Sequence, residues 1–152
     1  MIEPAQVKAE LETQLPGVTV QVEGPALVVE PKDLLAAAKQ LKNSAAWRLD
    51  FLSNLCGVDY PPERLETVYH LYSMEKRHGP LTMKVRVPRA HPHQPSVVSV
   101  WRSAEFQERE AYDLYGIVYD GHPDLRRILM WEGFEGHPMR KDYVIEDQDA
   151  PS

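Results

Sequence analysis

The sequence predicts an α+β fold, a four-stranded, mostly antiparallel sheet with helices packed on one face, followed by an irregular C-terminal segment. The chain has 152 residues, which suits one domain with a substantial core. Its composition, 43% hydrophobic and 26% charged, is typical of globular proteins. Alternating and helical hydrophobic spacings follow one another without a linker. We therefore expect one domain over 1–152, with an α+β core at 1–116 and an extended segment at 117–152.

The first third of the chain predicts a helix, two strands and a second helix. Apolar residues recur every fourth position after Pro4, and Pro16 and Gly17 end this helix. Residues 18–22 alternate apolar and polar, and residues 26–29 are continuously apolar, as in two paired strands. A second helix begins at Pro31, and the apolar periodicity continues through Leu49, Leu52 and Leu55, so a helical continuation is expected there.

A second hairpin is predicted at 67–73 and 81–87, where β-forming residues alternate with polar ones. Residues 88–95 contain three prolines, so irregular structure is expected. Between Lys76 and Arg102 there are six basic residues and no acidic one, with Lys84 and Arg86 on one strand face. Most of these charges fit a solvated hairpin. The sharper interpretation is a basic face that meets an acidic partner or, less favoured, RNA.

Residues 103–116 predict the most informative helix. Ser103 can cap its start, and Gly116 can end it in a left-handed conformation. Glu105, Arg109 and Asp113 form one stripe opposite the apolar arc, and the ladder of ion pairs that this spacing allows would be worth only a few tenths of a kcal/mol per pair if exposed. Glu108 instead lies inside the apolar arc, so it needs a cationic or hydrogen-bonding partner. Arg126 or Arg127 could pair with Glu108 or with Glu110, although two solvated arginines are equally plausible.

Two similar stretches follow, each with a Gly-His-Pro turn ahead of a pair of cations: Gly121-His122-Pro123 before Arg126-Arg127, and Gly136-His137-Pro138 before Arg140-Lys141. His122 and His137 could ligate a metal in a metal-dependent enzyme. A structural role fits better, because Gly and Pro set the turn and His hydrogen-bonds across it. Metalloprotease-type paired histidine spacing is absent from the sequence.

Composition excludes several functional classes. With one cysteine, Cys56, the chain alone cannot form an intrachain disulfide or ligate an iron–sulfur cluster, and a buried, inert thiol is favoured over a nucleophile. The formal charge of −6 disfavours a general nucleic-acid binder. The sequence carries no dinucleotide or P-loop motif, no signal-peptide pattern at its start and no apolar stretch long enough to span a bilayer.

The long run Glu108-Arg109-Glu110-Ala111-Tyr112-Asp113-Leu114-Tyr115-Gly116-Ile117, followed by residues 121–129, resembles the signature of the C-type subunit of respiratory complex I. This is the 30 kDa-type subunit of NADH:quinone oxidoreductase. Residues 136–143 are similar to the stretch that follows in that family, and residues 51–60 to its segment ahead of the second hairpin. So many matches at fixed spacing make the resemblance specific over residues 20 to 145.

The resemblance implies an α+β subunit of the hydrophilic arm that contacts the D-type subunit at the quinone site and lies near the B-type and I-type subunits. It implies that NAD, FMN, iron–sulfur clusters and quinone belong to partner subunits, so that this chain has no cofactor or catalytic residue of its own. It also implies a peripheral place on the cytoplasmic side of the cell inner membrane. A related membrane-bound hydrogenase or another donor:quinone complex remains the alternative. The implied interface and motif residues are Glu108, Arg109, Glu110, Asp113, Gly121, His122, Pro123, Arg126, Arg127, Gly136, His137, Pro138, Arg140 and Lys141.

Overall fold

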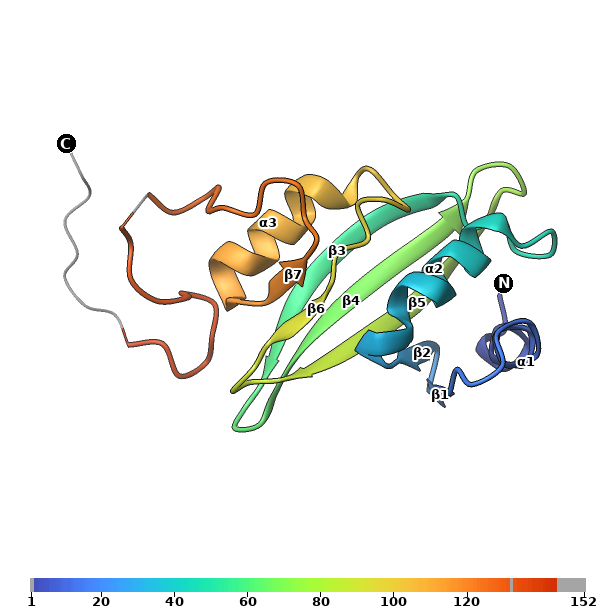
Figure 1. Cartoon of the computed structure of the whole chain (residues 1–152), viewed down its shortest axis with the longest axis horizontal. Helices are drawn as coiled ribbons and strands as arrows, with labels where there is room; N and C mark the ends of the chain where they lie inside the picture. The colour runs from blue at the N-terminus through green and yellow to red at the C-terminus, as the bar shows by residue number, and fades with distance from the viewer. Residues whose placement is uncertain (1, 132, 145–152) are drawn as a thin grey trace.

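A computed structural model describes residues 2–131 and 133–144, and its elements follow the α+β order (Figure 1). They are α1 (Pro4–Gln14), β1 (Val20–Glu23), β2 (Ala26–Val29), a 3-10 turn (Pro31–Asp33), α2 (Leu34–Asn43), β3 (Phe51–Tyr60), β4 (Arg64–Ser73), β5 (His78–Pro88), β6 (His93–Pro95), α3 (Ala104–Tyr115) and β7 (Val118–Asp120). In Figure 1, α2 and α3 lie in front of the sheet. The α+β prediction is confirmed.

The main sheet has five strands in the order β1-β2-β5-β4-β3, and every pair except the parallel β2–β5 pair is antiparallel. Residues directly opposite one another share a face. One such row joins Leu55, Tyr69, Met83 and Leu27, which are all at most 3% exposed and belong to the hydrophobic core. The core therefore fills the space between this face and the helices.

The expected helical continuation after α2 is wrong, because residues 51–60 form β3, the fifth strand. The pairing of β3 with β4 shifts between Leu52 and Asn54. An extra residue at this bulge allows Leu52 and Leu55, three positions apart, both to be buried on the same strand. Their spacing imitates that of a helix, which explains why the sequence predicted four strands rather than five.

A second, two-stranded sheet joins β6 to β7 in parallel, with Gln94 opposite Tyr119. Residues 88–95 are therefore partly regular, contrary to expectation, and β7 interrupts the segment predicted to be irregular from residue 117. The described residues after β7 form turns and bends without a further helix or strand. None of the helices in the described ranges is long and apolar enough to cross a membrane.

Helix α3 begins and ends close to its predicted bounds. Gly116 takes the left-handed conformation (φ 79°) that ends the helix, as expected. Ser103, however, makes no side-chain cap, because its hydroxyl donates to the carbonyl of Leu52 on β3 (2.9 Å). Gln107 Oε1 accepts from the amide of Leu55 (2.6 Å), so side chains of α3 satisfy backbone groups of the edge strand.

Candidate functional site

Asp113 of α3 organises the described C-terminal segment, which we define as residues 121–131 and 133–144. Its side chain is fully buried. Oδ2 accepts from three consecutive backbone amides, those of Ile128 (3.2 Å), Leu129 (2.7 Å) and Met130 (2.8 Å). Oδ1 accepts from Arg127 (2.8 Å). One carboxylate thus replaces the regular hydrogen-bond partners that this irregular backbone lacks.

Arg109, one helical turn earlier, holds the same stretch from the other side. It is 7% exposed, and its guanidinium donates to the carbonyls of Arg126 (3.2 Å) and Arg127 (3.3 Å). Arg109 and Asp113 are therefore buried, although their stripe lies opposite the apolar arc. The C-terminal segment covers this face of α3. The spacing of polar and apolar residues along the helix cannot predict that another segment packs there.

Glu108 is buried as predicted, but its partner is not an arginine. Its carboxyl accepts from the Ser96 hydroxyl (2.6 Å) and the Val97 amide (2.8 Å), in the loop that leads to α3. Burial raises the pKa of Glu108 to about 7 despite these two hydrogen bonds. Of the two alternatives for these arginines, a pairing with Glu108 is wrong, because Arg127 binds Asp113, and the solvated alternative holds for Arg126, which binds Asp124 at the surface.

The two histidines of the Gly-His-Pro turns contact backbone groups. One ring nitrogen of His122 lies 2.8 Å from the Glu105 carbonyl, and the other accepts from the Asp124 amide (2.9 Å). His137 Nδ1 lies 3.1 Å from the carbonyl of Asp113, and burial lowers the pKa of His137. Within the described ranges, no three His, Cys, Asp or Glu side chains form a possible metal site. These contacts support the structural interpretation of both histidines.

The second Gly-His-Pro turn packs against the end of α3. A Cβ atom at Gly116 would lie 2.7 Å from His137 and 2.8 Å from Arg140, so this close approach requires glycine. Arg140 donates to the carbonyl of Tyr115 (2.7 Å). Arg127 donates to the carbonyl of Gly136 (2.6 Å). The motif cations therefore satisfy carbonyls at the helix end and in the segment itself.

Asp59, at the end of β3, is a contributor that residue patterns alone did not reveal. It is 2% exposed, pairs with Arg89 and accepts from the backbone amide of Lys141 (2.7 Å). Burial would raise the pKa of Asp59, but the hydrogen bonds from Arg89 and Lys141 hold it below its usual range. An aspartate among buried strand residues was the available signal. The far end of the C-terminal segment is thus fixed to the sheet.

The other motif residues lie at the surface or in turns. Gly121 and Gly136 have positive φ angles of 87° and 91°. Glu110, Pro123 and Arg126 are exposed, Pro138 is half-buried, and the side chain of Lys141 is exposed. The cluster around the C-terminal segment therefore combines one of the predicted carboxylates, Asp113, with the predicted cations Arg109, Arg127 and Arg140, whereas Glu108 binds the loop before α3.

One further expectation needs correction, and part of the basic hairpin finds partners within the chain. Cys56 is half-buried rather than buried, and desolvation raises the pKa of its thiol, which disfavours a nucleophilic thiolate. Two of the six cations of the basic hairpin have partners within the chain: Arg86 binds Glu23 and Glu66, and Arg89 binds Asp59 and Asp142. Of the acidic residues near the end of the sequence, Asp142 is described, whereas those beyond residue 144 lie outside the described residues.

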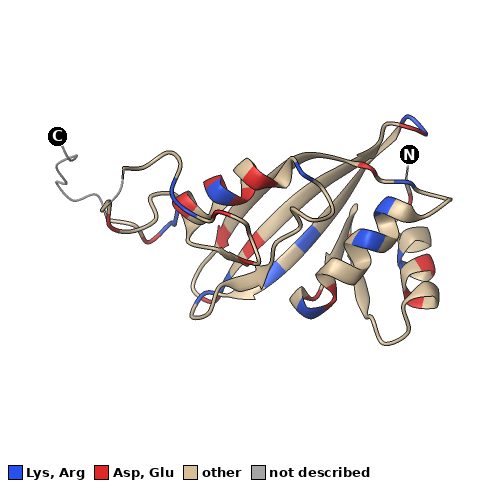
Figure 2. Cartoon of the chain, turned by 45° about the horizontal axis from the view of Figure 1, so that its top comes forward, with Lys and Arg blue, Asp and Glu red and all other residues tan. Residues whose placement is uncertain are grey.

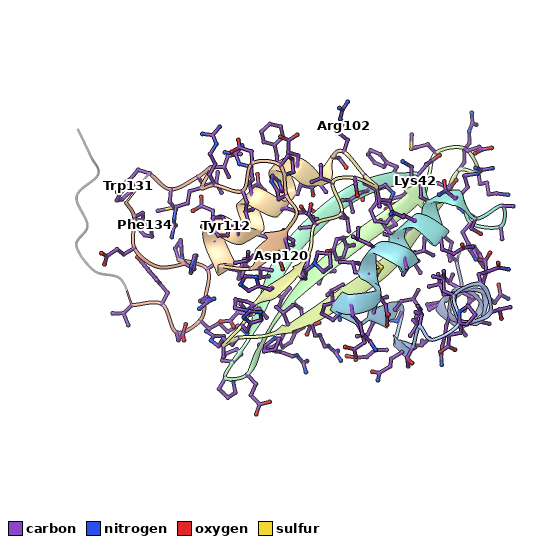
Figure 3. The ribbon with its side chains drawn as sticks, in the orientation of Figure 1. Lys42, Arg102, Tyr112, Asp120, Trp131 and Phe134 are labelled. Carbon is purple, nitrogen blue, oxygen red and sulfur yellow. The ribbon has the colours of Figure 1, made fainter. Side chains whose placement is uncertain are left out.

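Large apolar side chains lie on the outside of the C-terminal segment. Leu129 is 59% exposed and Met139 is 52% exposed, although the backbone of each is hydrogen-bonded to the helix. Trp131, which is half-buried, stacks edge to face at 4.9 Å on the buried ring of Phe134, at the end of the molecule farthest from α1 (Figure 3). A rigidly held backbone that presents apolar side chains is suited to contact with another protein.

Comparisons with known proteins agree with this architecture. The sequence profile described as "Respiratory-chain NADH dehydrogenase, 30 Kd subunit" matches residues 27–149. The C 2 subunit of the NADH-quinone oxidoreductase of Rhizobium meliloti (strain 1021) is 52% identical over 122 residues, 79% of this chain and 66% of that protein. The C subunit of the Moorella thermoacetica oxidoreductase is 44% identical over 142 residues, 91% and 94% of the two chains. The match spans 63% of a second relative, from Rhizobium etli (strain CIAT 652), and thus under two thirds of both rhizobial proteins.

Solved structures show the same fold. The trypsin-resistant fragment of Nqo5 superposes with a TM-score of 0.59 and 33% identity, over 82% of this chain and 100% of that one. A chain of the archaeal membrane-bound sulfane sulfur reductase superposes with a TM-score of 0.74 over 93% and 85%, but at 21% identity this shows the fold alone. The chain belongs to the family of the 30 kDa subunit of respiratory-chain NADH dehydrogenase.

Proposed function

We propose that this chain is a structural subunit of an NADH:quinone oxidoreductase and holds no cofactor of its own. The observation that carries this proposal is the use of the motif charges within the chain. Asp113, Arg109, Arg127 and Arg140 all bind backbone or one another around the C-terminal segment. A cluster that binds backbone in this way holds the C-terminal segment in one conformation. Its polar groups form hydrogen bonds within the chain.

The C-terminal segment is the surface that docks on the other subunits. Its exposed apolar side chains and its fixed backbone support this role, because a preordered surface loses little conformational entropy on binding. From the family resemblance, the chief partner is the D-type subunit at the quinone site, with the B-type and I-type subunits nearby. NAD, FMN, iron–sulfur clusters and quinone then reside in the partner subunits, and the chain supports the transfer of electrons without carrying them.

Association with the membrane follows from the same assignment. The proposed place is peripheral, on the cytoplasmic side of the cell inner membrane, and it is reached through the partner subunits. The domain arrangement, with a core at 1–116 and an extended segment at 117–152, also belongs to this proposal.

Affinity purification of the tagged full-length chain tests the proposal. We expect the subunits of an NADH:quinone oxidoreductase to copurify, including the one at the quinone site, and the isolated chain to contain no stoichiometric iron or flavin. If hydrogenase subunits copurified in place of the NADH-oxidising subunits, the chain would belong to a related membrane-bound hydrogenase and not to the proposed complex. A stoichiometric metal or flavin in the isolated chain would contradict a cofactor-free subunit.

A further inference from the structure

The main sheet has a second face, which the proposed role of the C-terminal segment does not involve. Opposite the core lies a face of β3, β4 and β5 that is turned away from α2 and α3; we call it the outer face. Its rows are Asn54, His70 and Thr82; Cys56, Val68 and Lys84; and Val58, Glu66 and Arg86. Apart from Glu66, these side chains are partly or fully exposed, whereas their neighbours on the core face are buried.

The exposed charge of the outer face is positive, although the whole chain carries a charge of −6. Glu66 is 1% exposed, and two guanidinium groups flank it, with Arg64 at 3.2 Å and Arg86 at 3.5 Å. The Arg64 and Arg86 side chains are 43% and 25% exposed. The carboxylate is therefore covered while the cations face outward, and Lys84 adds a third. Glu23, 52% exposed, offsets Arg86 at the β1 end.

These charges are set among apolar side chains. Val58, Val68 and Cys56 lie between the cations and the β3 edge, and Arg64 stacks over the ring of Tyr60 at 4.8 Å. Blue bands of Lys and Arg cross the strands in Figure 2. At about 3.3 Å per residue and about 4.8 Å between strands, β3, β4 and β5 offer about 490 Å² in projection. This is more than half of the roughly 800 Å² that each partner buries in a standard protein interface.

We propose that the outer face is a second docking surface, and that its occupant is an acidic protein surface of a neighbouring subunit. Carboxylates of the partner would meet Lys84, Arg86 and Arg64, and its apolar side chains would cover Val58 and Val68. The mixture of cations with a valine-rich surface favours a protein over a nucleic acid, since a nucleic-acid groove would require a more continuous basic track. This proposal rests on the proposed function, because the neighbouring subunit belongs to the same complex.

A pair of matched charge reversals tests the chemistry of the surface. Lys84→Glu reverses a charge on the outer face, whereas Lys39→Glu makes the same change on the exposed side of α2. We expect Lys84→Glu to weaken copurification with the complex by about ten-fold, as for a like-charge contact across an interface. Lys39→Glu should assemble like the wild type. Equal assembly of the two variants would overturn the proposal.

Thiol labelling tests coverage of the same face without altering its charge. In a Cys56→Ser background, His70→Cys places a probe on the middle strand of the outer face, in the row next to Lys84, and Gln14→Cys places a control at the end of α1. Assembly should slow maleimide labelling at residue 70 by about ten-fold or more, and leave residue 14 unchanged. Undiminished labelling at residue 70 in an assembled complex would refute the second surface alone. A wild-type chain that entered no complex would refute both proposals. If the chain retained RNA in a salt-sensitive way and Lys84→Glu abolished this retention, the occupant of the outer face would be RNA and not a protein.

Discussion

Removal of the Asp113 carboxylate should release the C-terminal segment from α3. Asp113→Ala leaves three backbone amides, at residues 128–130, and the Arg127 guanidinium without their acceptor. Removing one partner of a buried ion pair costs about 3–5 kcal/mol. We expect a loss of about 4 kcal/mol in the free energy that holds the segment, or about a 10³-fold rise in its opening equilibrium constant.

Limited trypsin digestion measures this opening, because Arg126, Arg127, Arg140 and Lys141 are cleavage sites within the segment. When opening is fast relative to cleavage, the cleavage rate follows the open population, so Asp113→Ala should be cut at least about 100-fold faster. Asp124→Ala is the control, because Asp124 forms an exposed ion pair with Arg126 and its loss should change the rate little. Equal cleavage of Asp113→Ala and wild type would refute the assignment of Asp113 as organiser.

Three further perturbations test the surrounding contacts. Because the folded pKa of Glu108, about 7, exceeds its ordinary value of 4.5, the contribution of Glu108 to stability is greatest below pH 4.5 and is lost as the pH rises from 4.5 to about 7. Urea unfolding should show a loss of about 3 kcal/mol by pH 8 that Glu108→Gln removes, and an unchanged pH profile would contradict this. Gly57→Ala places a Cβ atom 2.5 Å from the Tyr115 ring, so Tm should fall with a cost of about 2 kcal/mol, and an unchanged Tm would show that the ring can move. Asp59→Asn weakens the acceptor of the Lys141 amide and should speed trypsin cleavage there, whereas wild-type cleavage would rule out this anchor.

Sequence patterns correctly predicted those features that depend on residues close together in the chain. The bounds of α3 followed from apolar periodicity and from Gly116, whose left-handed conformation ends the helix. The burial of Glu108 followed from its place in the apolar arc. Strand β3 was missed because the bulge after Leu52 gives its leucines a helix-like spacing.

Contacts made by the irregular segment could not be predicted in the same way. Arg109 and Asp113 lie on a polar stripe that is usually solvated, and they are buried only because residues 126–130 cover them. No periodicity connects a helix to a covering chain without regular structure. The same limit applies to Asp59, whose partner Lys141 lies 82 residues away in the sequence. The family resemblance identified Arg109, Asp113, Arg126, Arg127 and Lys141 as a group but not their pairings, and it did not single out Asp59.

Activity per assembled complex tests most directly the claim that this chain is a scaffold and carries no electrons. A complex depleted of this subunit would be reconstituted with wild-type or Asp113→Ala chain, and quinone-dependent NADH oxidation divided by the amount of complex assembled. We predict that Asp113→Ala reduces the amount of complex and leaves the activity of each assembled complex unchanged. Normal assembly with reduced activity per complex would contradict the scaffold role and assign the chain a part in the chemistry.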